Sequence, residues 1–306
     1  MLVSLRFLRS IQANPLFQSL KRMLKAIITP VLYLDYVISR NVSEVDFPTF
    51  TGMNQRVFVF AHHSKTTLDV FDREILNSMR KLGFYTIFVT DLKKTNQVTA
   101  DLVLKKGSRG RDLGILRDFA RIFQGTVFKS TEILFCNNSM MWNAIKFEKL
   151  VASLSEYPND TFIFPSNSNN PSYHVQPYLV YINLSSTNYR KFQQSFDWIK
   201  NFRLKRSIVR FGEYPMSKRL NGMGWEQAVI APYKSVHQNF SLLHEEDPTF
   251  RKLTTSVLLN PTQEMWDGLI LSGIPGIKRS LVSLNPVGVI NVPDSLESAF
   301  RQVFER

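Results

Sequence analysis

The sequence predicts an α/β protein, a Rossmann-type, mostly parallel sheet flanked by helices, and three observations support this. Short apolar runs alternate with helical patterns over residues 56–164. A basic, glycine-containing loop at 105–112 opens a helix, and the apolar run at 132–136 ends abruptly in Asn-Asn-Ser. Strands that alternate with helices are typical of parallel sheets with crossover connections. Ligands bind such sheets at the carboxyl ends of the strands.

The composition favours a globular protein with an anionic partner. The 306 residues are 44% hydrophobic, so a sizeable core is expected. The net charge of +13 points to a nucleic acid, an anionic membrane surface or a phosphorylated substrate. The single cysteine, Cys136, lies in an apolar run and is predicted to be a buried thiol, which agrees with a reducing cytoplasm. The cysteine pairs of a zinc site are missing.

Residues 1–50 are predicted to form an N-terminal basic amphipathic helical segment. Residues 1–40 contain six Lys or Arg residues and one acid, Asp35. The apolar positions with helical spacing are Leu16, Leu20, Met23, Leu24 and Ile27. Such a helix either lies on an anionic bilayer or packs on the main domain with an exposed basic side. The apolar run at 26–34 is too short to span a membrane and contains Pro30, and a secretory signal is not recognisable.

The first half of the chain gives the clearest element predictions. Strands are expected at residues 56–61, 85–90, 100–104, 132–136 and 161–164, and helices at 69–82 and 147–155. A further helix begins at Asp112 and ends near Gly125, with an apolar face at three-to-four spacing. The second half is less regular. It is expected to hold a loop at 165–173, strands at 178–182 and 228–230, a helix at 186–202, a short helix ending near Gly222, and short helices and turns from 248 onward.

The loop at 105–112 is the first candidate binding site. Backbone NH groups, arginines and a helix N-terminus together make a seat for phosphates. Alternatively, the basic residues form a solvated loop and Asp112 only caps the helix, and the stretch alone does not decide between the two.

Six segments in order resemble the rhamnan synthesis protein F family over residues 57–284. They read FAHHS, KKGSRGRDLG, ILFCNNS, HVQPYLVYIN, GEYPMSKRLNGMG and NPTQEMWDGLILSGIPGIKRSL. The resemblance implies a GT-A-like fold and a glycosyltransferase of the hexosyltransferase class. Such an enzyme would transfer rhamnose or another deoxyhexose from a nucleotide-sugar donor (a dTDP-, UDP- or GDP-sugar). The acceptor would be a lipid-linked oligosaccharide in lipopolysaccharide or related bacterial surface polysaccharide biosynthesis. The expected location is cytoplasmic, peripheral on the inner face of the cell membrane.

The resemblance also implies site residues. Donor-binding residues would be His62, Arg109, Gly110, Arg111, Asp112, Asn137 and Ser139. The catalytic candidates are Glu213, as base, and His174, and the substrate-binding candidates are Gln176 and Tyr178. Glu213 could instead be a carboxylate stabilised by a helix N-terminus, and His174 a structural histidine.

Two departures from the family pattern bear on a divalent metal. The family's loop has an asparagine where this chain has Arg109, and its strand commonly ends in Asn-Asp-Ser where this chain has Asn138 in the middle. An amide is a poorer ligand for Mg²⁺ or Mn²⁺ than a carboxylate. Asn138 is therefore a doubtful metal ligand. Either the metal is absent and arginine and lysine offset the diphosphate charge, or donor binding is weak.

The expected organisation has three parts: residues 1–50, a catalytic domain at 51–240, and a C-terminal helical extension at 241–306 packed on it. Two other functions remain open. A catalytically inactive family member could scaffold polysaccharide assembly. A nucleic-acid-binding protein is disfavoured, because the basic residues are spread along the chain without a helix-turn-helix or zinc-finger pattern.

Overall fold

The structure, a computed structural model, describes most of the chain. The described residues are 28–40, 43, 45, 47, 56–63, 68–92, 98–107, 111–123, 129–169, 172–246, 259–285, 289 and 292–304. None of the helices within these ranges has the length and apolar character needed to cross a bilayer.

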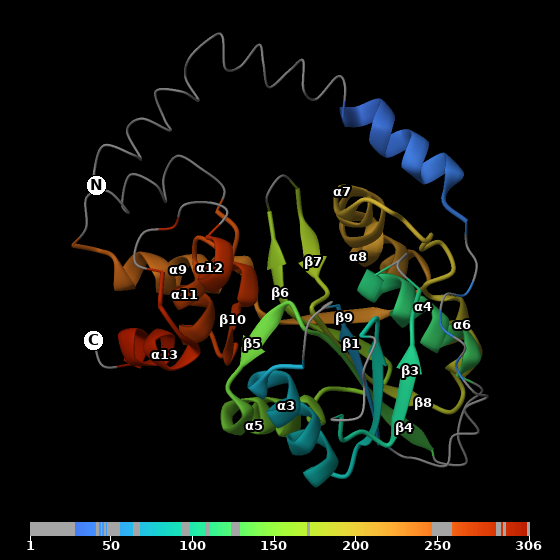
Figure 1. The fold of residues 1–306 in the computed structure, drawn as a ribbon, viewed down its shortest axis with the longest axis horizontal. Helices are drawn as coiled ribbons and strands as arrows, with labels where there is room; N and C mark the ends of the chain where they lie inside the picture. The colour runs from blue at the N-terminus through green and yellow to red at the C-terminus, as the bar shows by residue number, and fades with distance from the viewer. Residues whose placement is uncertain are drawn as a thin grey trace.

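An eight-stranded, mostly parallel sheet forms the centre of the molecule, which confirms the predicted α/β class (Figure 1). The strands are β1 (Arg56–His62), β2 (Tyr85–Thr90), β3 (Leu102–Lys105), β4 (Ser130–Asn137), β6 (Thr161–Ser168), β7 (His174–Gln176), β8 (Leu179–Ser185) and β9 (Glu226–Ala231). Their order is β3-β2-β1-β4-β8-β6-β7, and β9 pairs with β6. The pairs β3-β2, β2-β1, β1-β4 and β6-β9 are parallel, whereas β8 runs antiparallel to β4 and β6, and β7 antiparallel to β6.

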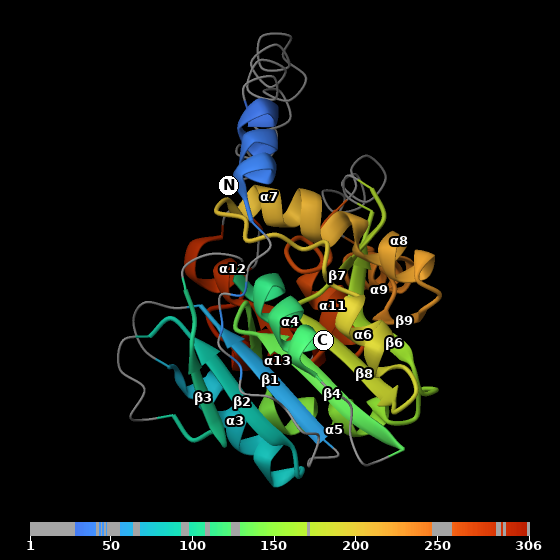
Figure 2. The ribbon, with the colours of Figure 1, turned by 90° about the vertical axis from the view of Figure 1, so that its right-hand side faces the viewer.

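Helices cover both faces of the sheet. Outside the sheet lie a helix at 28–38, α3 (Val70–Lys81), α4 (Arg111–Ile122), α5 (Ala144–Leu154), α6 (Tyr189–Gln194), α7 (Lys205–Ile208), the π-helix η1 (Val209–Glu213), α8 (Tyr214–Gly222), α9 (Tyr233–Leu243), α11 (Trp266–Leu271), α12 (Arg279–Leu284) and α13 (Leu296–Phe304). Apolar side chains of α4, α6, α7 and α8 pack on one face, and those of α3, α5, α9 and α11 on the other (Figures 1 and 2). Along β1, Val57 and Val59 join the first cluster and Phe58 and Phe60 the second. A strand covered on both faces reads as a continuous apolar run, which made β1 predictable.

The carboxyl ends of three parallel strands meet at one edge, as predicted. His62 lies opposite Thr90 of β2, and Ala61 lies opposite Asn137 of β4. The residues that follow β1 and β4 therefore enter the same space, beside the first turn of α4.

Two predictions for the second half were wrong. The expected helix at 186–202 is only the short α6. The expected loop at 165–173 is in part strand, because β6 continues to Ser168. Its polar residues are bonded to β7 and α9: Ser166 Oγ donates to Gln176 Oε1 (2.7 Å), and Asn167 Oδ1 accepts from the backbone NH of Tyr233 (2.7 Å).

The C-terminal extension reaches the carboxyl edge through a small second sheet. There β10 (Gly276–Lys278) pairs antiparallel with β5 (Met140–Trp142), just after β4. The approach is close, since a Cβ atom on Gly276 would lie 2.8 Å from the carbonyl oxygen of Met141. The residues after Gly276 are thereby placed directly beside the end of β4.

Candidate active site

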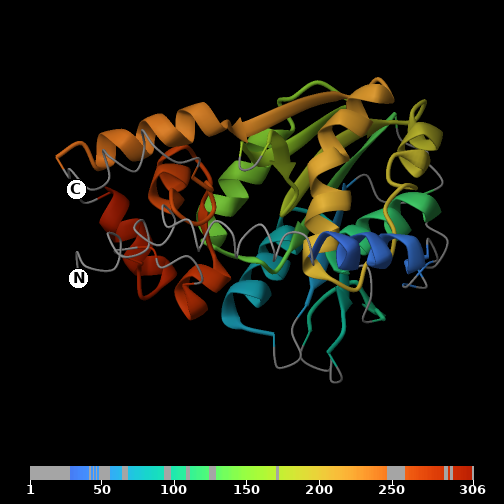
Figure 3. The ribbon, with the colours of Figure 1, turned by 90° about the horizontal axis from the view of Figure 1, so that it is seen from above.

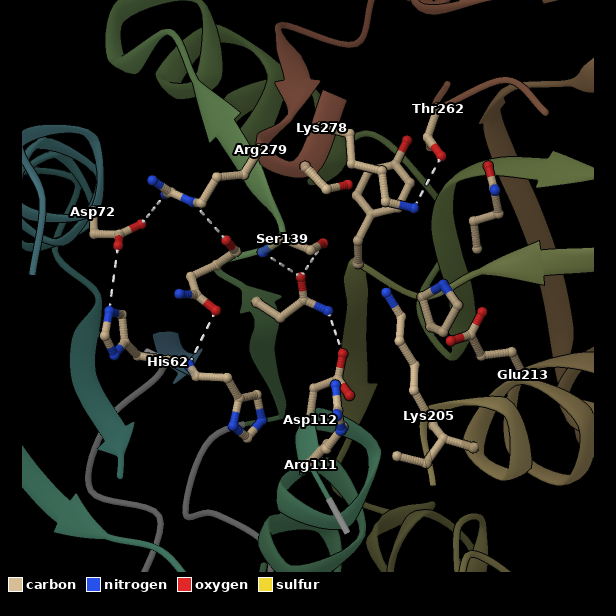
Figure 4. Close-up of a pocket in the computed structure, with 18 of the residues that line it drawn as sticks. His62, Asp72, Arg111, Asp112, Ser139, Lys205, Glu213, Thr262, Lys278 and Arg279 are labelled. Carbon is tan, nitrogen blue, oxygen red and sulfur yellow. Dashed lines mark hydrogen bonds and ion pairs between the residues drawn. The ribbon is translucent and has the colours of Figure 1, made fainter. Parts of the chain in front are cut away.

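A cavity of about 390 Å³ lies at the carboxyl edge of the sheet (Figure 4). This volume is typical of a small-molecule site. Its lining combines the strand ends with the π-helix and the C-terminal extension: His62, His63, Asp69, Asp72, Arg111, Asp112, Asn137, Asn138, Ser139, Gln176, Pro177, Tyr178, Lys205, Ile208, Glu213, Thr262, Lys278, Arg279, Ser280 and Ser283.

Three predicted site residues meet in one hydrogen-bonded group. Asn137 Nδ2 donates to Asp112 Oδ2 (2.5 Å), and Asn137 Oδ1 accepts from the backbone NH (3.0 Å) and Oγ (2.5 Å) of Ser139. The group joins the end of β4 to the start of α4. Arg109 and Gly110, also predicted here, lie outside the described residues.

The two histidines at the end of β1 are uncharged at neutral pH. His62 is 0% exposed, its Nδ1 lies 3.1 Å from Thr90 Oγ1, and its Nε2 lies 3.5 Å from Asp72 Oδ2. Burial lowers the pKa of His62 to about 4, and burial together with the Lys106 charge lowers the pKa of His63 to about 4. His62 therefore forms cavity wall and offers no cation to a phosphate. The buried Nε2 of His63 has no hydrogen-bond partner within the described part of the chain, so it can bond a ligand hydroxyl.

Arg279, which the sequence reasoning missed, ties the C-terminal extension to the site. Its guanidinium is paired through Nη1 with Asp69 and through Nη2 with Asp72 (2.9 Å), and its Nε donates to the carbonyl of Asn138 (3.0 Å). The backbone NH of Arg279 also donates to the carbonyl of Ser139 (2.9 Å). With its charge matched by two carboxylates, Arg279 has a structural role at the cavity edge.

Three other cations line the cavity from separate elements: Arg111 at the start of α4, Lys205 at the start of α7, and Lys278 at the end of β10. None of them forms an ion pair with a described residue. Lys278 Nζ donates to Thr262 Oγ1 (3.4 Å), and burial lowers its pKa while the nearby Glu213 charge opposes that shift. Arg111 has a φ of 45°, in the left-handed region that a residue other than glycine rarely adopts. Such backbone strain is concentrated at functional sites.

Glu213, the predicted base, is the last residue of η1 and lines the same cavity, where Lys278 and Lys205 act on its charge (Figure 4). Burial, with a further contribution from the Asp112 carboxylate, raises its pKa to about 7, although Lys278 and Lys205 act in the opposite direction. A π-helical turn is itself common at functional sites. The preceding Gly212 allows η1 to approach α4, since a Cβ atom there would lie 2.7 Å from Leu113 Cδ1. A carboxyl group with a pKa near neutral pH can both take up and release a proton at that pH.

The two predicted substrate-binding residues also reach the cavity. Tyr178 Oη lies 2.9 Å from Ser166 Oγ, and Gln176 Nε2 donates to Asn260 Oδ1 (3.2 Å). These bonds fix both side chains in the cavity wall.

His174, the second catalytic candidate, does not line the cavity. Its Nδ1 lies 2.8 Å from the carbonyl of Ser172, and its ring packs on Tyr214 with centroids 4.6 Å apart. These contacts give it a structural role at the start of β7.

The oxygen donors at the predicted metal position are already engaged. Asn138 Oδ1 accepts from the backbone NH of His63 (3.0 Å), and its carbonyl accepts from Arg279. In the described ranges, no cluster of three or more His, Cys, Asp or Glu side chains is arranged to hold a metal ion. The residues present at Asn138 therefore do not fit a divalent metal, which prefers several charged oxygen ligands.

Comparison with known proteins shows a distant similarity to a virulence protein. No family model matches the chain. The virulence protein VirA of Vibrio anguillarum (strain ATCC 68554 / 775) is 24% identical over 262 residues, which cover 78% of this chain and 80% of VirA. A second VirA sequence from Vibrio anguillarum gives the same values. The similarity therefore covers most of both chains, and the name VirA describes a role in virulence without a reaction.

Proposed function

We propose that this protein is a glycosyltransferase that moves a sugar, such as rhamnose or another deoxyhexose, from a nucleotide-sugar donor to a lipid-linked glycan acceptor. The setting is bacterial surface polysaccharide biosynthesis at the cytoplasmic face of the membrane. The observation that supports this most strongly is that Arg111, Lys205 and Lys278 line one cavity together with Glu213. The resemblance of six ordered segments to the rhamnan synthesis protein F family supplies the sugar and acceptor class.

The three cations suit the diphosphate of a nucleotide-sugar. Breaking the bond between the sugar and the diphosphate leaves negative charge on the leaving oxygen. Cations held by a rigid site stabilise that charge because they need no reorientation during the reaction. Arg111, Lys205 and Lys278 come from three different elements, so they can surround the two phosphates. The buried Nε2 of His63 is available to a hydroxyl of the ribose or the sugar.

Glu213 is the proposed general base. The acceptor hydroxyl oxygen forms a bond to the anomeric carbon of the sugar, and its proton moves to the Glu213 carboxylate. The bond between the anomeric carbon and the phosphate oxygen breaks, and its electron pair leaves with the nucleoside diphosphate. A base with a pKa near the working pH is the most effective for such a proton transfer. Gln176 and Tyr178 line the cavity wall where they can position the acceptor.

The donor's charge would be offset by side chains. The engaged oxygens of Asn138 support this, as do the three cavity cations, which have no ion-pair partner in the described chain. The metal dependence of donor binding is expected to be weak.

Isothermal titration calorimetry with UDP, GDP and dTDP tests the proposal on the full chain. We expect one nucleotide to bind with 1:1 stoichiometry, and Arg111→Ala to weaken it. A coupled assay for release of that nucleotide from its sugar conjugate then tests catalysis. Binding without any release would favour the inactive scaffolding protein. Absence of binding to all three nucleotides would contradict the proposed function.

A further inference from the structure

The helix at 28–38 carries an outward apolar ridge, which we define as Val31, Tyr33, Leu34, Val37 and Ile38. These side chains are 49–63% exposed. The only charged residue of this helix, Asp35, is buried on the opposite side. Soluble helices normally present charged and polar groups to water, so an outer face made only of large apolar residues marks an interaction surface.

The inner side of the helix fixes the ridge to the body of the protein. Asp35 accepts hydrogen bonds from the backbone NH groups of Arg203 and Leu204, both at 3.2 Å, just before α7. Lys200 Nζ donates to the carbonyl of Tyr36 (3.0 Å). Figures 2 and 3 show the helix, in blue, beside the gold segment that holds α7. The ridge is therefore held in one orientation by α7 and the loop before it.

The segment that supports the ridge is strongly basic. Residues 198–212 contain five Lys or Arg residues and no acid. Arg203, Arg206 and Arg210 are exposed there, and Arg40 is exposed at the end of the ridge helix. An apolar ridge with cations along its flank matches the two layers of an anionic lipid surface, the acyl region and the headgroups.

We propose that the ridge inserts into the interface of an anionic bilayer while Arg203, Arg206 and Arg210 contact the headgroups. The described part of the helix, residues 28–38, is too short to cross the hydrocarbon layer, and we propose that it lies in the interface plane. The charge argues against a second copy of this chain as the occupant. A twofold contact across the ridge would place the same basic flank of each copy beside the other.

The apolar ridge is also connected to the cavity, so docking of the ridge would bring the cavity near the lipid surface. Lys205, the first residue of α7, lines the cavity, and Tyr36 packs against Phe211 of η1 with ring centroids 4.9 Å apart. The elements that support the ridge therefore also carry the cavity's Lys205 and Glu213. Docking would hold the cavity close to the lipid surface, where a lipid-linked acceptor resides; this last step rests on the proposed function.

Co-sedimentation of the full chain with vesicles tests the docking surface. One set of vesicles is phosphatidylcholine alone, and the other is equimolar phosphatidylcholine and phosphatidylglycerol. Two double variants and one single variant are compared: L34Q/I38Q on the ridge, R203Q/R206Q on the flank, and L242Q. L242Q is the matched control, because Leu242 on α9 is a similarly exposed leucine (61%). Thermal denaturation verifies that each variant is folded.

The unmodified protein should bind the anionic vesicles more tightly than the neutral ones. The ridge variant should lose at least about tenfold in affinity for both, since its apolar anchors are gone. The flank variant should lose roughly fivefold per arginine on anionic vesicles only, and less at high salt. L242Q should bind like the unmodified protein.

Equal binding by L34Q/I38Q and the unmodified protein would overturn the proposal, as would the absence of vesicle binding. A concentration-dependent dimer in sedimentation that L34Q/I38Q abolishes, without vesicle binding, would assign the ridge to a second copy instead. Nucleotide titration of the same variants separates the test of the docking surface from the test of the proposed function. If the variants bind vesicles in the expected order of affinity but no nucleotide binds, the docking surface would be supported and the proposed glycosyltransferase function contradicted.

Discussion

Asn137 donates a hydrogen bond from Nδ2 to Asp112 Oδ2 at 2.5 Å, which joins the end of β4 to the first turn of α4. The bond holds the Asp112 carboxylate inside the cavity, where its charge raises the pKa of Glu213. The same bond uses the Asn137 amide, which the family resemblance would assign to the donor. In the proposed reaction, Asp112 would therefore act through Glu213.

Replacing Asp112 with Asn should shift the pH dependence of sugar transfer. Without the negative charge of Asp112, the pKa of Glu213 falls, so activity should reach its plateau at lower pH. The rate of nucleotide release, measured between pH 5 and pH 9 at saturating donor, gives the midpoint. Asp197→Asn, which alters a half-exposed carboxylate paired with Arg121, is the control. An unchanged midpoint in D112N would contradict the coupling.

Replacing Glu213 with Gln should abolish the base while the donor site remains. We expect transfer to fall by about 10²- to 10⁴-fold, with donor affinity changed little. Calorimetry and the release assay on one preparation measure both quantities. A variant that retains full transfer would show that another group takes the proton.

The same substitution should change stability in a defined pH window. The pKa of Glu213 is raised from 4.5 to about 7, so the folded state holds a proton that the unfolded state has lost. The free energy of unfolding contributed by this group therefore falls as the pH rises from 4.5 to 7. E213Q should be more stable than the unmodified protein at pH 8 and gain little at pH 4. Thermal denaturation at both pH values tests this, and an equal gain at both would contradict it.

Replacing Lys205 with Met should weaken nucleoside diphosphate binding by about tenfold or more, because a charged hydrogen-bond donor contributes roughly 1.5–3 kcal/mol. Lys218 is a matched control, since it is exposed on the neighbouring α8 but does not line the cavity. Titration calorimetry of K205M and K218M with the same nucleotide compares them directly. Equal affinities would place the diphosphate elsewhere.

Removing divalent metal should leave nucleotide binding almost unchanged. The oxygens of Asn138 already accept hydrogen bonds from His63 and Arg279, and Arg111, Lys205 and Lys278 supply positive charge. Titration in the presence of a chelator measures the effect. Asn138→Asp, which introduces the carboxylate of the family pattern, should make binding more dependent on Mn²⁺. Complete loss of wild-type binding in chelator would contradict this expectation.

Replacing Arg279 with Met should destabilise the protein, since it leaves the buried Asp72 without its cation. The expected loss is roughly 3 kcal/mol, typical of breaking one partner from a buried pair. The matched control is Arg80→Met, which removes a pair with the partly exposed Asp101 (26%) instead of the buried Asp72 (4%) and should cost about 0–1 kcal/mol. Urea denaturation of both variants measures the difference in the free energy of unfolding. Equal losses would show that the ion pairs of Arg279 with Asp69 and Asp72 stabilise the fold no more than the Arg80 pair does.

The sheet was predictable where its strands are buried on both faces. The runs that became β1, β2 and β4 are continuous apolar stretches, and their polar ends identified the edge where the cavity lies. The end of β6 was not predictable, because Ser166 and Asn167 read as loop residues. Their polarity is satisfied by partners from β7 and α9, which no local pattern reveals.

The site was predictable only in part, for a similar reason. Asp112, Asn137 and Ser139 follow directly from strand ends and a helix start. Lys278 and Arg279 reach the cavity through the pairing of β10 with β5, a contact between distant segments. Sequence spacing carries no information on such a contact, although both residues lie within the last of the segments that resemble the polysaccharide family.

Because Arg279 pairs with Asp69 and Asp72, the cavity is completed late in chain synthesis. Asp69 and Arg279 are 210 positions apart. Most of the sheet can therefore form on the ribosome before Arg279 has left the exit tunnel. A nascent chain that ends before β10 would hold Asp69 and Asp72 without their cation and a cavity without Lys278. Closing this long loop is entropically slow compared with local folding. Under the proposed function, donor binding would therefore arise only after most of the sheet has folded.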